Sequence, residues 1–111
     1  MVTYEELFAK IEAHINKADK TKERKVPYSY TFKLTKDGNV IKSYFIDLKN
    51  LTYKVGEHPA DCTITLDHEL MVKLGTGAMK AADALSQDLV SIEGKVELVM
   101  ALETFIGQLN A

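Results

Sequence analysis

The side chains with the widest chemistry in this sequence are three histidines and one cysteine, and they are scattered along the chain. His14, His58 and His68 form neither the i,i+4 pair nor the Cys/His cluster that a transition metal needs. Cys62 falls on the apolar side of an alternating run, which is typical of a small buried residue rather than of a nucleophile. The sequence therefore predicts no metal site and no catalytic thiol.

Two other motifs are too incomplete to support catalysis or phosphate binding. His68 and Glu69 are adjacent, and adjacent residues on a helix do not face one another as an acid and base must. The run Gly75-Thr76-Gly77 follows an expected helix and lacks the spacing of a phosphate-binding loop. No catalytic residue and no cofactor is predicted, and an interpretation as a small hydrolase or isomerase lacks a nucleophile and base.

Positive charge is concentrated before the first expected strand. Residues 1–56 carry a net charge of +4 and residues 57–111 a net charge of -6, which together give the overall -2. The basic segment holds Lys17, Lys20, Lys22, Arg24 and Lys25, and Arg24 is the only arginine. Three interpretations stay open, namely a solvated loop, a contact with an anionic membrane surface, and a site for an anionic ligand group. Nucleic acid is not an expected partner, because the segment has no aromatic residue for stacking.

Composition and length indicate one soluble domain spanning residues 1–111. The chain is 46% hydrophobic and 27% charged, which excludes disordered and collagen-like classes. A single cysteine is consistent with a reducing compartment, and no apolar run approaches the roughly 20 residues that cross a bilayer. With no leader pattern at the start, the predicted location is cytoplasmic.

The hydropathy periods predict an α+β fold. Thr3 and Glu6 form a capping box before an amphipathic helix over 4–16. Period-two alternation and turn residues predict four strands, expected to be antiparallel, over 28–35, 40–48, 51–55 and 61–66. Asp37-Gly38 is the expected turn of the first hairpin.

The second half of the chain is predicted to add three helices and a fifth strand. Asp67 is the expected N-cap of a short helix that Gly75 ends. A helix over 80–87, a strand over 89–93 and a helix over 95–109 follow. The apolar surface of the last helix is wider than one stripe, so this helix either packs in a groove of the sheet or also lines a cavity.

Five short motifs carry a resemblance over nearly the whole chain. They are Asp37-Gly38, Ile46-Asp47-Leu48-Lys49-Asn50, Ala60-Asp61-Cys62-Thr63-Ile64-Thr65-Leu66, Gly75-Thr76-Gly77-Ala78 and Ile92-Glu93-Gly94-Lys95-Val96-Glu97-Leu98. In this order and spacing the sequence resembles the sterol carrier protein 2 domain family, and it is most similar to the small free-standing insect members.

The resemblance implies a five-stranded, mainly antiparallel sheet covered by about four helices that enclose a hydrophobic lipid-binding tunnel. It also implies a carrier without enzymatic activity for fatty acids, fatty acyl-CoA and sterols. The sequence departs from the family pattern at three positions, with Tyr44 where Trp is common, Leu51 where Gly is frequent, and His14 where close relatives have an arginine near the ligand's polar end.

Site residues follow from the same resemblance. The ligand head group is expected to meet Arg24, the backbone amides around Lys25 and Val26, and His14 at the position of the arginine. The tunnel wall is expected to comprise Ile11, Ile15, Phe32, Ile46, Leu48, Leu66, Met71, Leu74, Leu102, Phe105 and Ile106. For each wall residue, ordinary core packing is the alternative.

The sequence therefore predicts an intracellular lipid carrier whose preferred ligand is a C16–C18 fatty acid, with sterol and acyl-CoA as alternatives. It is expected to act in the cytosol as a monomer or weak homodimer, with transient membrane contact during delivery left open. The rival interpretation is a protein-interaction or self-association module that uses the apolar C-terminal helix.

Overall fold

The computed structural model describes residues 3–17 and 28–109, except for the side chains of Thr104 and of residues 106–109. The elements follow one another as α1 (Tyr4–Lys17), β1 (Ser29–Lys36), β2 (Asn39–Asp47), β3 (Thr52–Val55), β4 (Cys62–Asp67), α2 (His68–Gly75), α3 (Ala81–Ser86), β5 (Ser91–Glu93) and α4 (Val96–Leu109). This order confirms the predicted α+β class, and the predicted elements agree with the observed ones to within a few residues.

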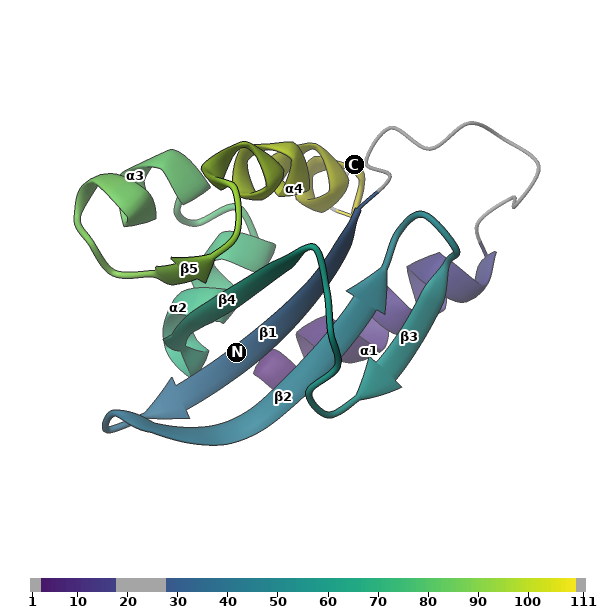
Figure 1. The fold of residues 1–111 in the computed structure, drawn as a ribbon, viewed down its shortest axis with the longest axis horizontal. Helices are drawn as coiled ribbons and strands as arrows, with labels where there is room; N and C mark the ends of the chain where they lie inside the picture. Colours follow the sequence, from purple (N-terminus) through teal and green to yellow (C-terminus); the bar gives the residue numbers. More distant parts are fainter. Residues whose placement is uncertain (1–2, 18–27, 110–111) are drawn as a thin grey trace.

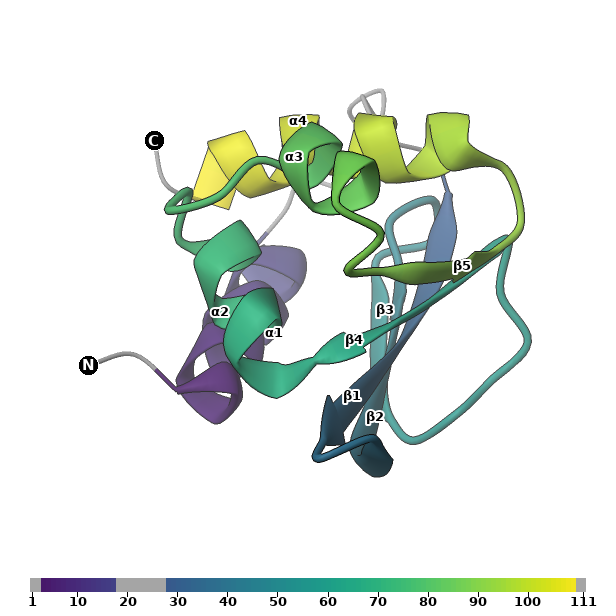
Figure 2. The same ribbon diagram turned by 90° about the vertical axis from the view of Figure 1, so that its left-hand side faces the viewer.

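The five strands form one open sheet in the order β3-β2-β1-β4-β5. The helices lie on one face of this sheet, with α1 and α2 behind it in the view of Figure 1 and α3 and α4 along its upper edge. Turned by 90°, the same molecule shows the sheet nearly edge-on with the helices to one side and above (Figure 2). The apolar core therefore lies between the sheet and a single layer of helices.

Helix α1 packs against the β1–β2–β3 side of the sheet through the face that its hydropathy pattern predicts. Its buried residues are Leu7, Phe8, Ile11 and Ile15. Half of the predicted capping box is present, because the backbone N–H of Glu6 donates to Oγ1 of Thr3 at 3.2 Å.

The first hairpin turns at Asp37-Gly38 as predicted. Both residues have positive φ angles, 54° and 83°, which is the requirement of a type I′ turn. The register between β1 and β2 shifts after Leu34, and Ile41 has no partner in the ladder there. This bulge leaves Ile41 43% exposed.

One strand pairing differs from the prediction. β1 pairs with β4 in parallel, whereas the first four strands were expected to be antiparallel. The reason is the short segment 56–61, which crosses the open face of the sheet instead of closing a hairpin (Figure 1).

Polar contacts attach this crossing segment to the strands beneath it. Lys33 Nζ and Glu57 Oε1 are 2.8 Å apart, and the hydroxyl of buried Thr31 donates to the carbonyl oxygen of His58 at 2.6 Å. At its end, Asp61 accepts from the backbone N–H of Ser29 at 3.0 Å. The crossing is therefore fixed by tertiary contacts, which no local pattern encodes.

Helix α2 begins as predicted and ends for a different reason. The carboxylate of Asp67 accepts from the N–H of Glu69 at 2.9 Å, so the predicted N-cap is confirmed. Gly75 is the last helical residue and not a left-handed stop, since Thr76 is the C-cap. A Cβ at Gly75 would overlap the methyl groups of Leu7, so glycine lets α1 approach closely here and a larger residue would force Leu7 to move.

Candidate functional site

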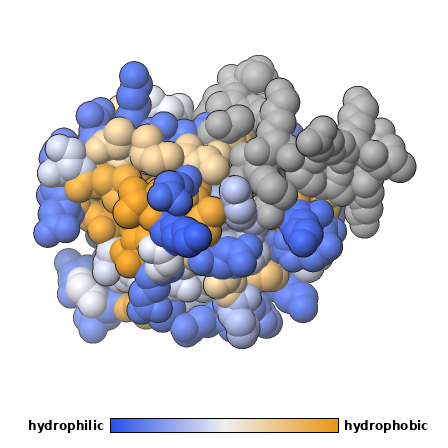
Figure 3. Space-filling view, turned by 45° about the horizontal axis from the view of Figure 1, so that its top comes forward, coloured by the Kyte–Doolittle hydropathy of each residue, from blue (hydrophilic) through white to orange (hydrophobic). Residues whose placement is uncertain are grey.

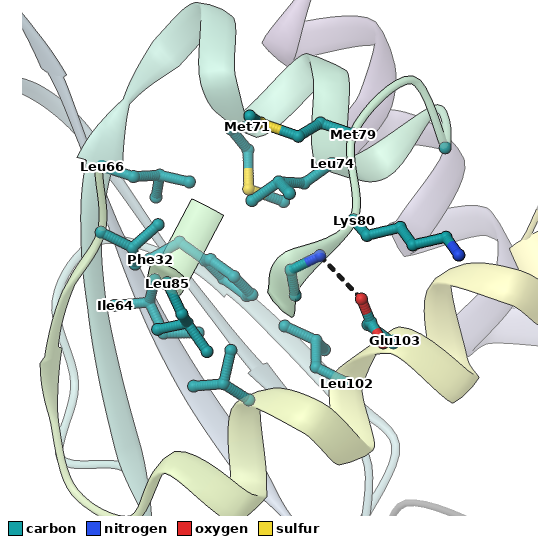
Figure 4. Close-up of a pocket in the computed structure, with 14 residues that line it drawn as sticks. Phe32, Ile64, Leu66, Met71, Leu74, Met79, Lys80, Leu85, Leu102 and Glu103 are labelled. Carbon is teal, nitrogen blue, oxygen red and sulfur yellow. Dashed lines mark hydrogen bonds between the residues drawn. The ribbon is translucent and has the colours of Figure 1, made fainter. Parts of the chain in front are cut away.

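A cavity of about 400 Å³ lies between the sheet and helices α2, α3 and α4. Figure 4 shows Phe32, Ile64 and Leu66 approaching it from the strands, with Met71 and Leu74 opposite and Leu102 at the base. Its lining comprises Phe32, Ile64, Leu66, Met71, Leu74, Gly77, Met79, Lys80, Ala81, Leu85, Val90, Val99, Leu102 and Glu103. The size falls within the roughly 300–1,000 Å³ typical of small-molecule pockets, and the lining is mostly apolar as such pockets are.

The half of the core beneath α1 is filled by stacked rings. Phe8 and Tyr44 stack with ring centroids 3.9 Å apart, and Phe8 meets Phe32 edge-on at 5.6 Å. None of the residues that line the cavity belongs to α1. The described core is thus packed under α1 and hollow under α2, α3 and α4.

The predicted wall residues divide between these two halves. Phe32, Leu66, Met71, Leu74 and Leu102 line the cavity. Ile11, Ile15, Ile46, Leu48 and Phe105 are buried but do not line it. The side chain of Ile106 lies outside those that the structure describes.

The predicted head-group residues lie mostly beyond the described part of the chain. Arg24, Lys25 and Val26 fall in the segment 18–27, whose placement is outside the described residues. His14 is half-buried on α1, and its ring meets Phe105 edge-on with centroids 5.4 Å apart. It is not among the residues that line the cavity.

Sequence reasoning missed the polar side of the cavity. Lys80 and Glu103 both line it, and the carboxylate of Glu103 accepts a hydrogen bond from the backbone N–H of Ala81 at 2.7 Å (Figure 4). Lys80 is the N-cap of α3 and makes no side-chain capping bond, so α4 supplies the acceptor instead. The available signal was a glutamate one residue after Leu102, which the family resemblance placed in the tunnel wall.

Helix α4 is held over the cavity by a tyrosine from the sheet. Tyr30 is fully buried on β1, and its hydroxyl donates to the carbonyl oxygen of Leu98 at 2.5 Å. Burial raises the pKa of this phenol above its ordinary value, with smaller contributions from the nearby Cys62, Tyr28 and Asp61. The phenol therefore stays protonated as a donor.

Cys62 occupies the buried position that its alternation predicts. It is fully buried on β4, and burial raises the pKa of its thiol, with a smaller contribution from Asp61. Within residues 3–17 and 28–109, no three His, Cys, Asp or Glu side chains gather as a metal site would require. None of the helices described there is long and apolar enough to span a bilayer.

Comparison with known proteins assigns the family. A family model described as the SCP-2 sterol transfer family matches residues 8–107. Hydroxysteroid dehydrogenase-like protein 2 of Xenopus tropicalis is 31% identical over 111 residues, which is 96% of this chain and 25% of that protein. The chain thus spans about a quarter of the length of the curated relatives it matches.

Solved structures agree with the family model. Sterol carrier protein 2 from Aedes aegypti, in complex with the C16 fatty acid palmitate, is 34% identical, covers 96% of each chain and superposes with a TM-score of 0.78. Sterol carrier protein 2-like 3 from the same mosquito shares the fold at 19% identity, covering 97% of this chain and 99% of that one with a TM-score of 0.84. These matches confirm the resemblance that the five motifs carry, and the chain belongs to the SCP-2 sterol transfer family.

Proposed function

We propose that this protein is a carrier without catalytic activity that binds a long-chain lipid in the cavity under α2, α3 and α4. The supporting observation is the cavity of about 400 Å³ with its apolar lining from five elements. The preferred ligand is a C16–C18 fatty acid, with sterol and fatty acyl-CoA as alternatives, and the proposed place of action is the cytosol. The palmitate held by the similar mosquito protein supports this ligand class.

The energetics favour binding through the acyl chain. Burial of about fourteen methylene groups at about 0.8 kcal/mol each gives on the order of 11 kcal/mol before the costs of association and ordering. A charge-assisted hydrogen bond to the head group adds about 1.5 to 3 kcal/mol. Chain burial therefore sets the affinity, and the polar contact sets the orientation.

The proposed polar contact is Arg24, together with the amides of Lys25 and Val26. Replacement Arg24→Ala is expected to weaken palmitate binding by about 1 to 3 kcal/mol and to leave methyl palmitate, which has no carboxylate, nearly unaffected. Lys20→Ala, which removes one positive charge from the same segment, is the matched control. If both substitutions weaken palmitate binding equally, Arg24 contributes only its positive charge and is not the specific head-group contact.

The carrier proposal is tested by titration of delipidated protein with palmitate. Leu102→Glu places a charge in the cavity wall and is expected to abolish binding, because an unpaired carboxylate beside an alkyl chain is costly. Ile41→Glu introduces the same charge at an exposed position and is expected to bind like the parent protein. Circular dichroism of both variants checks the fold, and a folded Leu102→Glu that still binds palmitate would contradict the proposal.

The outer face of α4 favours a second candidate, self-association. Val96 and Met100 are 54% and 40% exposed. Figure 3 shows apolar residues gathered at the surface on the side that carries α3 and α4. Sedimentation of delipidated protein should reveal concentration-dependent association if this face joins two copies, and Met100→Lys should then abolish it.

A further inference from the structure

The carboxylate of Glu103 lies in the lining of an otherwise mostly apolar cavity, where a charged group needs hydrogen-bond donors. The side chain is half-buried on α4, and its Oε1 accepts from the N–H of Ala81 at 2.7 Å. In the described part of the chain, the carboxylate has no ion-pair partner, since the ion pair found there joins Lys33 and Glu57. Oε2 is thus a charged acceptor without a donor among the described residues.

The bond to Ala81 does not by itself require a charge. A neutral amide oxygen at the same place could accept from that N–H equally well. A carboxylate at the wall of an apolar cavity is costly unless it is hydrogen-bonded, so the second oxygen needs a donor from water or from a ligand. Because the Glu103 side chain is half-buried, water can supply that donor when the cavity is empty, and a polar group of a bound lipid can replace this water.

The surrounding charges select the chemical class of the donor. A fatty acid carboxylate beside Glu103 would place two negative charges together in a poorly hydrated space. A cationic amine would meet the positive charge of Lys80, whose side chain lines the same side of the cavity and ends at its rim (Figure 4). A hydroxyl group carries no charge, can donate to Oε2 and can accept a hydrogen bond from an ammonium or from water.

We propose that Glu103 selects lipids with a hydroxyl head group by accepting a hydrogen bond from that hydroxyl, and that it excludes carboxylate heads from this end of the cavity. The inference rests on the proposed lipid-carrier function and adds a specificity determinant to it. A bound fatty acid would accordingly place its methyl end, and not its carboxylate, beside Glu103.

Three ligands with the same sixteen-carbon acyl or alkyl chain test this proposal, namely 1-hexadecanol, palmitate and methyl palmitate. Glu103→Gln keeps an oxygen for Ala81 but replaces the charged acceptor with an NH₂ donor. It is expected to weaken hexadecanol binding by roughly tenfold and to leave palmitate and methyl palmitate nearly unchanged, because neither of these two ligands places a hydrogen-bond donor beside Glu103. Glu97→Gln removes the same charge from an exposed position on α4 and should change none of the three affinities.

A loss confined to hexadecanol separates recognition from stability. A general loosening of the cavity would weaken all three ligands together, so equal losses in Glu103→Gln would overturn the inference, and so would three unchanged affinities. If the parent protein binds neither hexadecanol nor palmitate, the carrier function itself fails. If it binds both and Glu103→Gln does not discriminate, only the role of Glu103 fails.

Discussion

Filling the cavity should stabilise the empty protein and weaken lipid binding at the same time. Val99 is 5% exposed on α4 and lines the cavity. Phenylalanine is larger than valine by on the order of 50 Å³, and about 24 cal/mol for each Å³ of cavity filled gives about 1 kcal/mol of added stability for Val99→Phe. The same ring would displace about two or three methylene groups of a bound chain, which costs about 2 kcal/mol or roughly thirtyfold in affinity.

A matched substitution in the packed half of the core should lower stability and leave lipid affinity nearly unchanged. Ile46 is fully buried on β2 and does not line the cavity. Enlarging a side chain in a filled core forces its neighbours to move, so Ile46→Phe is expected to destabilise the protein by about 1 to 3 kcal/mol. Its lipid affinity should change little in the folded fraction.

Urea denaturation of delipidated protein measures the stability term, and palmitate titration measures the binding term. Val99→Phe is expected to gain stability and to lose palmitate affinity. Ile46→Phe is expected to lose stability and to keep its palmitate affinity. If Val99→Phe is as destabilising as Ile46→Phe, the space beside α4 is not a persistent cavity and the reasoning fails.

Three further expectations concern the fold that surrounds the cavity. Burial raises the pKa of Tyr53 from its ordinary value near 10 to about 12. The protein should therefore lose stability as the pH rises from about 10 towards 12, and Tyr53→Phe should flatten that decline. Gly75→Ala should cost about 1 to 3 kcal/mol in urea denaturation, because its Cβ would overlap Leu7, and prior truncation by Leu7→Ala should remove most of that additional cost. Thr31→Val should cost about 1 to 2 kcal/mol, more than Glu57→Gln, since the threonine hydroxyl is buried whereas the Glu57 side chain is 63% exposed; an equal effect would contradict this ranking.

Local signals were sufficient for the elements of this fold but not for one of its pairings. Turn chemistry at Asp37-Gly38 and the N-cap at Asp67 are encoded within a few residues, and both are present as predicted. The parallel pairing of β1 with β4 depends on where the segment 56–61 runs. A connection this short reads as a hairpin, because parallel crossovers ordinarily need a dozen or more residues.

The sequence could indicate that a cavity was possible, but the hydropathy pattern could not identify which residues line it. Hydropathy identifies which side chains leave water, but packing decides whether atoms then fill the space behind them. Ile46 and Leu66 have the same apolar parity in their strands, yet Ile46 is fully buried away from the cavity while Leu66 lines the space under α2. The difference comes from which helix lies above each strand, and that is a property of the assembled layer. The same reasoning explains why Glu103 was missed, since its proximity to Ala81 exists only once α3 and α4 are in contact.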